Sequence, residues 1–200
     1  MDKYASFAEL CAAEPSGHFE IACEERIGSQ VIVIAPHGGK IEVHTSEIAR
    51  AIAGEDFSYY SFNGRKRRNN GDLHITSHRF DEPSGVALVA RHRWVVAVHG
   101  CKGDRPRVLL GGRDARLKLD IAERLATRGI QAETGGHEYQ GLAIGNICNR
   151  GAGAAGVQIE LTMPFRERSD AVSELVVAVR DALLGRTGTA RGNQRIDVRR

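Results

Sequence analysis

Three apolar runs constrain the fold of this chain more than any other feature of its sequence. Residues 30–35 and 94–98 are apolar at nearly every position and rich in β-branched side chains, and residues 157–161 form a third apolar strand in which Gln158 and Glu160 stand out. A strand with one solvated face would alternate apolar and polar residues, so these runs indicate strands buried on both faces. Such strands belong to sheets that helices cover on both sides. We therefore predict an α/β fold with a central mixed, mostly parallel sheet flanked by helices.

Amphipathic segments around these runs supply the predicted helices. Residues 114–128 place Leu117, Ile121 and Leu125 on one face, and residues 169–184 repeat apolar side chains at helical spacing. Shorter helices are predicted at 5–13, 46–53 and 84–91, and shorter strands at 19–25, 58–62, 73–76 and 107–110. The apolar pattern stops after Gly185, so we expect one domain over residues 1–185 and a basic, disordered tail over residues 186–200.

Charge and hydropathy argue against two classes of partner. The net charge is +3, but the last 15 residues hold five arginines and one aspartate, which leaves 23 basic and 24 acidic residues in the body. A nucleic-acid-binding domain carries its basic face on the folded part, so we do not expect nucleic acid as the partner. No apolar run approaches the roughly 18 residues of a membrane span, and the first residues lack a secretory signal, so we expect a cytoplasmic protein without a membrane partner.

Two of the buried runs end in histidine followed by glycine. His37 stands in Pro-His-Gly-Gly after residues 30–35, and His99 stands in His-Gly after residues 94–98. Ligands gather at the carboxyl ends of strands, so we expect both imidazoles at one sheet edge. Glu42 follows His37 by five residues, and the glycines permit a tight turn that returns its carboxylate. Two histidines and a glutamate are the ligands of a catalytic zinc site, so we predict Zn²⁺ here; the alternative is that each histidine only caps its strand.

Glu160 is the predicted general base. It interrupts the apolar run at 157–161, where a charge is costly unless it has a task or a partner. In a zinc hydrolase a carboxylate accepts a proton from the activated water and passes it to the leaving amine. The alternative is an acid with a purely structural partner at a strand end.

Asn149 and Arg150 are predicted to bind a substrate carboxylate. An arginine fork holds a carboxylate in bidentate fashion, and a neighbouring asparagine can add a donor. The alternative is an ordinary loop arginine at the surface.

Five segments in a fixed order carry a family resemblance: APHGGKIE, LHITSHRFDEP, VAVHG, NICNRG and GVQIEL. Together they resemble the poly-γ-glutamate hydrolase family of bacteriophages and phage-related bacterial proteins. The resemblance implies a fold like that of zinc carboxypeptidases, zinc on His37, Glu42 and His99, and Glu160 as the base. It also implies that Asn149 and Arg150 form the carboxylate-binding pair of that fold.

The resemblance further implies the reaction, which is hydrolysis of γ-glutamyl amide bonds in a polymer whose residues each carry a free carboxylate. Arg150 and the basic cluster at residues 65–68 would attract such an anion. His74, in the second segment, either reaches the site and contacts substrate or lies in the core. Asn63 stands where the family pattern has glutamate. This departure bears on the predicted polymer substrate more than on the predicted metal.

We therefore predict a monomeric zinc-dependent amidohydrolase that acts on an anionic γ-glutamyl polymer or a small acidic peptide. A first alternative is an amidohydrolase for N-acyl amino acids, of the N-formylglutamate type, which substrate length would distinguish. A second is a phage-derived, non-enzymatic nucleic-acid-binding accessory protein that uses the arginine-rich loop and tail. A phage origin would also allow cell lysis to release the protein.

Overall fold

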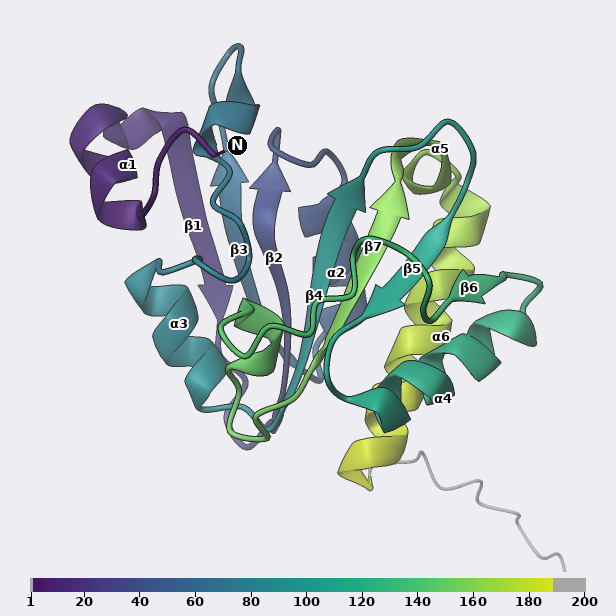
Figure 1. Cartoon of the computed structure of the whole chain (residues 1–200). Helices are drawn as coiled ribbons and strands as arrows, with labels where there is room; N and C mark the ends of the chain where they lie inside the picture. Colours follow the sequence, from purple (N-terminus) through teal and green to yellow (C-terminus); the bar gives the residue numbers. More distant parts are fainter. Residues whose placement is uncertain (1, 189–200) are drawn as a thin grey trace, which may run out of the picture.

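The computed structural model describes residues 2–188, which form one α/β unit (Figure 1). The strands are β1 (Phe19–Glu24), β2 (Val31–Gly39), β3 (Ser58–Gly64), β4 (Trp94–Cys101), β5 (Val108–Gly111), β6 (Ala132–Glu133) and β7 (Val157–Thr162). The helices are α1 (Phe7–Ala13), α2 (Thr45–Ala53), α3 (Pro83–Ala90), α4 (Ala115–Ala126), α5 (Met163–Arg166) and α6 (Ser169–Thr187). Three 3₁₀ turns add η1 (Ser16–His18), η2 (Asn70–Leu73) and η3 (Ile147–Asn149).

The sheet has seven strands in the order β1-β3-β2-β4-β7-β5-β6. Its four central strands, β3, β2, β4 and β7, are parallel, while β1 and β5 pair antiparallel with their inner neighbours. The predicted mixed, mostly parallel sheet is therefore confirmed. All four central strands point their carboxyl ends to one edge, and that edge is where the predicted ligands lie.

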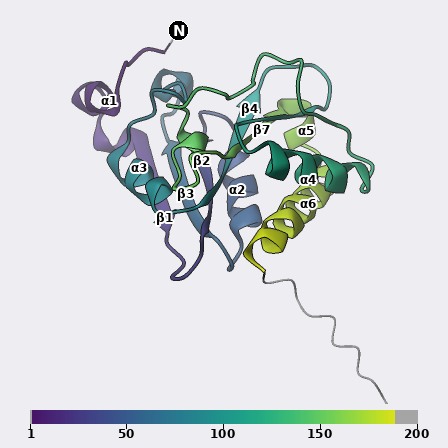
Figure 2. The same cartoon turned by 60° about the horizontal axis from the view of Figure 1, so that its bottom comes forward.

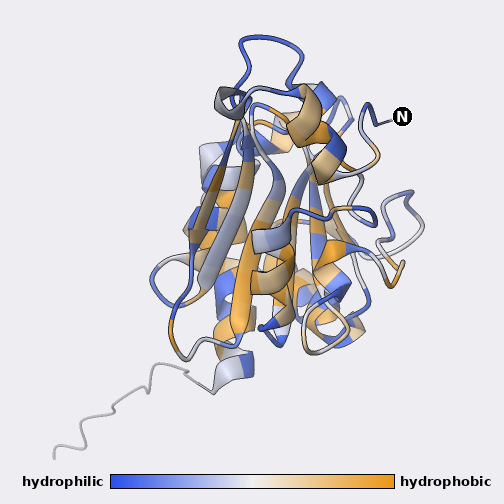
Figure 3. Cartoon of the chain, turned by 90° about the vertical axis from the view of Figure 1, so that its left-hand side faces the viewer, coloured by the Kyte–Doolittle hydropathy of each residue, from blue (hydrophilic) through white to orange (hydrophobic). Residues whose placement is uncertain are grey.

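Helices cover both faces of the sheet, as the apolar runs require (Figure 2). Along β2, Val31, Val33 and Ala35 pack toward α2, α4 and α6, whereas Ile32 and Ile34 pack toward α1 and α3. In Figure 3 the hydrophobic colouring accordingly lies mainly on the strands and on parts of the helices. Among residues 2–188 no helix combines the length and the apolar character needed to cross a membrane.

Several predicted boundaries are wrong. Residues 74–76 form no strand, because η2 ends at Leu73 and an irregular segment follows. The helix predicted to begin at residue 46 begins at Thr45, and its N-cap is His44 in the left-handed conformation. The last helix, predicted to end at residue 184, continues to Thr187. The predicted disordered tail lies, from residue 189 onward, outside the described residues.

Candidate metal centre

His37 is turned toward the cleft by an irregularity in β2. Ala35 pairs with Ser61 of β3 and Gly38 pairs with Asn63, so β2 holds one extra residue in the interval that contains Pro36 and His37. Such a bulge re-aims a side chain, and proline fits there because it has no N–H to donate. The His37 Nε2–H donates to the Ile75 carbonyl at 2.8 Å, since a carbonyl can only accept. In the neutral ring the lone pair is therefore on Nδ1.

Glu42 returns to His37 through a tight turn. Its backbone N–H donates to the His37 carbonyl at 2.9 Å, which closes the turn that begins at the two glycines. Gly39 has φ 61°, and a Cβ there would lie 2.7 Å from the Gly64 carbonyl oxygen, so no other residue fits this position without strain. The Glu42 carboxylate then accepts the Gly100 backbone N–H at 2.8 Å, which ties the turn to the end of β4.

His37, Glu42 and His99 converge on one point. The two Nδ1 atoms are 3.2 Å apart. Glu42 Oε1 lies 3.3 Å from His37 Nδ1, and Glu42 Oε2 lies 3.7 Å from His99 Nδ1. Ligand atoms placed about 2.1 Å from a tetrahedral metal ion are about 3.4 Å from one another. The observed spacings are close to this value, so the three side chains could hold a metal ion, and three protein ligands would leave a fourth tetrahedral position open.

The electrostatics of the cluster favour a cation. Burial acts to raise the pKa of Glu42, but His37 and His99 outweigh it and hold that pKa below its ordinary value. Burial acts to lower the pKa of His99, and the carboxylates of Glu160 and Glu42 raise it above its ordinary value. His99 Nε2 is buried without a hydrogen-bond partner among the described residues. The cluster thus concentrates the buried acid Glu160 and the partly buried acid Glu42 around imidazoles, and a bound cation would stabilise these acids.

Glu160 lies beside this cluster on β7. It is the register partner of His99, and its side chain is buried. Gln158, two residues earlier on the same face, donates from Nε2 to Glu160 Oε1 at 3.1 Å. Burial, reinforced by the negative charge of Glu42, raises the pKa of Glu160 to about 7, although His99 acts to lower it. A carboxyl with that pKa can accept and return a proton near neutral pH.

A cleft of about 590 Å³ opens over these residues. Its lining includes the three clustered side chains, Glu160 and His74, and Lys102 adds a solvent-exposed cation. Tyr139 and Gln158, which the sequence did not single out, line the cleft as well. The signal for Gln158 was its position two residues before Glu160, because alternate residues of a strand share one face.

His74 lies beside the cluster of His37, Glu42 and His99, and not in the hydrophobic core. Its ring centroid is 4.0 Å from that of His37, and its Nε2 is 3.9 Å from Glu42 Oε1. Its Nδ1 pairs with Asp2 at 2.8 Å. No sequence pattern could have indicated Asp2, because its partner is 72 residues away.

Asn149 and Arg150, the predicted carboxylate-binding pair, are not among the residues that line the cleft in this structure. Asn149 Nδ2 donates to the carbonyls of Gly141 and Ala143, and its Oδ1 accepts the backbone N–H groups of Arg113 and Gly156. Arg150 Nη1 donates to the Phe80 carbonyl at 2.6 Å. The amide of Asn149 is therefore fully used in joining loops, and both side chains have partners in the fold.

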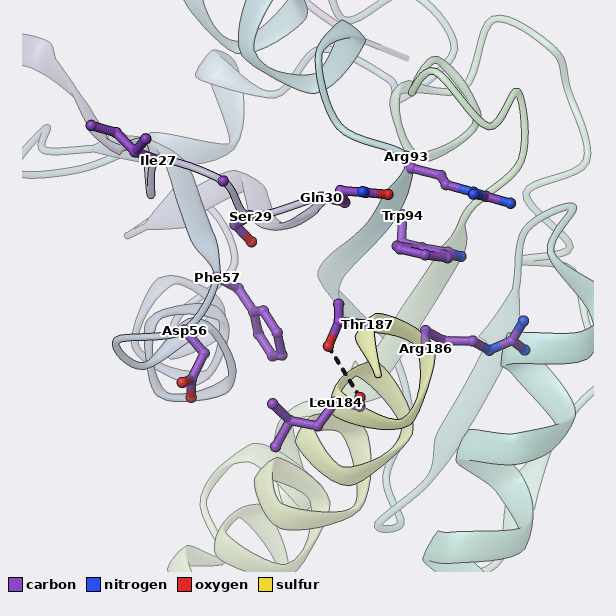
Figure 4. A pocket seen from close by; sticks show the side chains of 11 residues that line it. Ile27, Ser29, Gln30, Asp56, Phe57, Arg93, Trp94, Leu184, Arg186 and Thr187 are labelled. Atoms are coloured by element: carbon purple, nitrogen blue, oxygen red, sulfur yellow. Dashed lines mark hydrogen bonds between the residues drawn. The ribbon is translucent and has the colours of Figure 1, made fainter. Parts of the chain in front are cut away.

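A second cleft, of about 520 Å³, lies at the opposite end of the central strands (Figure 4). Arg93 stacks over the Trp94 ring at 4.8 Å, and Asp56 and Arg186 lie on other parts of the wall. Among residues 2–188, histidine, cysteine or acidic side chains with metal-ligand spacing occur at His37, Glu42 and His99 and not in this second cleft. The candidate metal-binding group of residues 2–188 therefore lies at the carboxyl edge of the sheet.

An α/β sheet with a His-Glu-His cluster and a buried carboxylate at its carboxyl edge defines a metallohydrolase-like protein. Residues 4–171 match the model of the poly-gamma-glutamate hydrolase family, and the chain belongs to that family of enzymes. The predicted family is therefore confirmed.

Relatives and solved structures agree with this membership. YmaC of Bacillus subtilis (strain 168) is 38% identical over 168 residues, which are 83% of this chain and 71% of YmaC. YndL of the same organism is 36% identical over 83% of this chain and 66% of its own length. The structure of a bacteriophage poly-gamma-glutamate hydrolase superposes with a TM-score of 0.89 at 29% identity, covering 94% of this chain and all of that one. The zinc-free apo form of YndL superposes with a TM-score of 0.85 at 32% identity, covering 92% and 98%.

Proposed function

We propose that this protein is a zinc-dependent amidohydrolase that cleaves γ-glutamyl amide bonds of poly-γ-glutamate or a related acidic peptide. The proposal is carried by the convergence of His37, Glu42 and His99, whose Nδ1 atoms are 3.2 Å apart and lie 3.3 and 3.7 Å from the nearer oxygens of the Glu42 carboxylate. The donor set of two imidazoles and one carboxylate is that of catalytic zinc sites. The related YndL, whose apo form is described as zinc-free, supports zinc as the metal.

Zinc held by these residues would supply a Lewis acid that polarises an amide carbonyl and lowers the pKa of a water molecule. The Ile75 carbonyl fixes the tautomer of His37, and the Gly100 N–H orients the carboxylate of Glu42. Such supporting contacts hold ligands in position before the metal binds, and their loss typically weakens metal affinity.

Glu160 is the proposed general base. It takes a proton from the attacking water as the carbon–oxygen bond forms, and it delivers that proton to the amide nitrogen as the carbon–nitrogen bond breaks. Its pKa of about 7 suits both transfers, and Gln158 holds the carboxyl through one oxygen. The products are a carboxylic acid and an amine, so water is the only co-reactant that the reaction consumes.

Cationic groups near the cleft support an anionic substrate. Lys102 lies on the rim of the cleft. Arg67 and Arg68, on the loop that follows β3 at the same edge of the sheet, are exposed. Within residues 2–188 neither arginine takes part in an ion pair, so both are available to a polymer with one carboxylate per unit.

The test combines metal analysis with depolymerisation of poly-γ-glutamate. We expect close to one zinc per chain, chelator-sensitive cleavage, and recovery on adding zinc back. His99→Ala should lose both the metal and activity, whereas His18→Ala, a histidine that does not line the cleft, should keep both. An active enzyme that is free of metal would contradict the proposal. Release of small amines from N-acyl amino acids without any fall in polymer length would instead favour the N-formylglutamate type.

A further inference from the structure

Asp2 lies before α1 and outside residues 4–171, the part that matches the family model. Its carboxylate nevertheless reaches the edge of the metal cluster, where its side chain is only 7% exposed. One oxygen accepts from His74 Nδ1 at 2.8 Å. The other accepts the Thr76 backbone N–H at 2.7 Å and Arg79 Nη2 at 2.6 Å. Both carboxylate oxygens of Asp2 therefore accept hydrogen bonds from the short segment 74–79.

The contact with Asp2 determines which atom of His74 faces the cleft. A carboxylate only accepts, so Nδ1 of His74 carries the proton, and in the neutral ring Nε2 carries the lone pair. Nε2 is 3.9 Å from Glu42 Oε1, which is too far for a hydrogen bond. His74 lines the cleft, so this lone pair is presented to whatever binds there.

A purely structural histidine is bonded differently in this same chain. His92 is buried and uses both ring nitrogens, Nδ1 with the Leu88 carbonyl at 2.7 Å and Nε2 with Ser58 Oγ at 2.8 Å. His74 has one nitrogen fixed by a buried carboxylate and the other turned to the cleft, with 32% of its side chain exposed. That asymmetry is what a side chain needs in order to bond a ligand in one orientation.

We propose that Asp2 is a positioning residue, which holds His74 so that its Nε2 accepts a hydrogen bond from an N–H of the bound substrate beside the metal ligands. The inference rests on the proposed function, since a polyamide substrate supplies the N–H. Asp2 itself touches neither the substrate nor the three ligands. It acts by fixing the tautomer and the ring orientation of His74, as carboxylates do for histidines at other hydrolytic sites.

The experiment measures the ring tautomer of His74 and the rate of cleavage in the same zinc-loaded variants. Nitrogen-15 NMR of the His74 ring should show Nδ1 protonated in the wild type and a shift toward the Nε2-protonated form in Asp2→Ala. Asp2→Ala should lower kcat/KM about tenfold, within the range for removing a residue that orients a site histidine. Lys3→Ala is the matched control in the same segment, because Lys3 Nζ pairs with Asp72 and not with the site; it should stay within twofold of wild type.

A double-mutant cycle separates this role from simple anchoring of the segment. If Asp2 acts through His74, Asp2→Ala in a His74→Ala background should change kcat/KM by less than twofold. Equal losses in both backgrounds, or an unchanged His74 tautomer in Asp2→Ala, would overturn the inference. Should Asp2→Ala fail to fold, the isosteric Asp2→Asn is measured in the same way. A wild-type chain that cleaves no γ-glutamyl substrate refutes the proposed function, whereas an active wild type matched by Asp2→Ala refutes only the role of Asp2.

Discussion

His99 and Glu160 are register partners on the adjacent parallel strands β4 and β7. Partners in a parallel pair project to the same face, so an imidazole and a carboxylate lie side by side where both strands end. Both side chains are buried, and each perturbs the pKa of the other. This pairing places the proposed base next to a proposed metal ligand without any loop having to close, so the chemistry depends on strand register.

Glu160→Gln should abolish turnover while the metal stays bound. The amide keeps the size of the carboxyl and can still bond Gln158, but it cannot accept a proton, so we expect kcat to fall by about 10² to 10⁴. Steady-state kinetics with zinc quantified in the same sample would measure this. Glu138→Gln makes the same change at an exposed acid of the same cleft and should stay within twofold. Normal turnover in Glu160→Gln would refute the assignment of the base.

The pH dependence of kcat/KM should show an acid limb that belongs to Glu160. Burial raises the pKa of Glu160 to about 7, and a nearby bound cation acts in the opposite direction, so the limb should lie at or below pH 7. The base is active when deprotonated, and activity is therefore lost as pH falls through that pKa. The residual activity of Glu160→Gln should lack this limb. If Glu160→Gln kept the acid limb unchanged, that limb would belong to a titratable group other than Glu160.

Acid stability should depend on a different carboxylate, Glu14. Burial acts to raise its pKa, but hydrogen bonds from His18, Tyr4 and Lys66 lower it to about 2 in the folded state. The unfolded chain then binds more protons between about pH 4.5 and 2, so this contribution is complete above that window and is lost as pH falls through it. Glu14→Gln should lower the free energy of unfolding at pH 7 by about 1 to 2 kcal/mol and flatten its acid dependence. Urea denaturation at several pH values would check this, with the exposed Glu123→Gln as a control that should keep the wild-type slope.

The sequence predicted those parts of the fold and site that depend on local patterns. The apolar runs located the central strands, and the His-Gly ends of two of them located His37 and His99, because parallel strands bring their carboxyl ends to one edge. The two-residue strand β6 left no such pattern, since it exists only by pairing with β5. Asp2 reaches His74 through tertiary packing alone, and no spacing rule connects them.

Asn149 and Arg150 show why a local motif does not by itself determine a role. An Asn-Arg pair predicts a carboxylate site only if its donors are free, and the sequence does not reveal which donors the fold consumes. Here Asn149 satisfies four backbone groups, those of Gly141, Ala143, Arg113 and Gly156. Buried groups left without partners are costly, so Asn149→Ala should lower the free energy of unfolding by about 2 to 3 kcal/mol.

Arg150→Ala should then leave substrate binding nearly unchanged. The guanidinium bonds the Phe80 carbonyl and does not line the cleft, so we expect KM and kcat to stay within twofold of wild type, with a stability loss of about 1 kcal/mol. Lys102→Ala, which removes a cation from the cleft rim, should raise KM for the anionic polymer several-fold, and added salt should reduce the difference because it screens exposed charges. Initial rates of wild type, Arg150→Ala and Lys102→Ala at two ionic strengths would show which of the two cations binds the substrate carboxylate. A tenfold rise in KM for Arg150→Ala, with Lys102→Ala unchanged, would mean that the substrate carboxylate binds Arg150 after that side chain leaves Phe80, and that the sequence-based assignment describes the bound state.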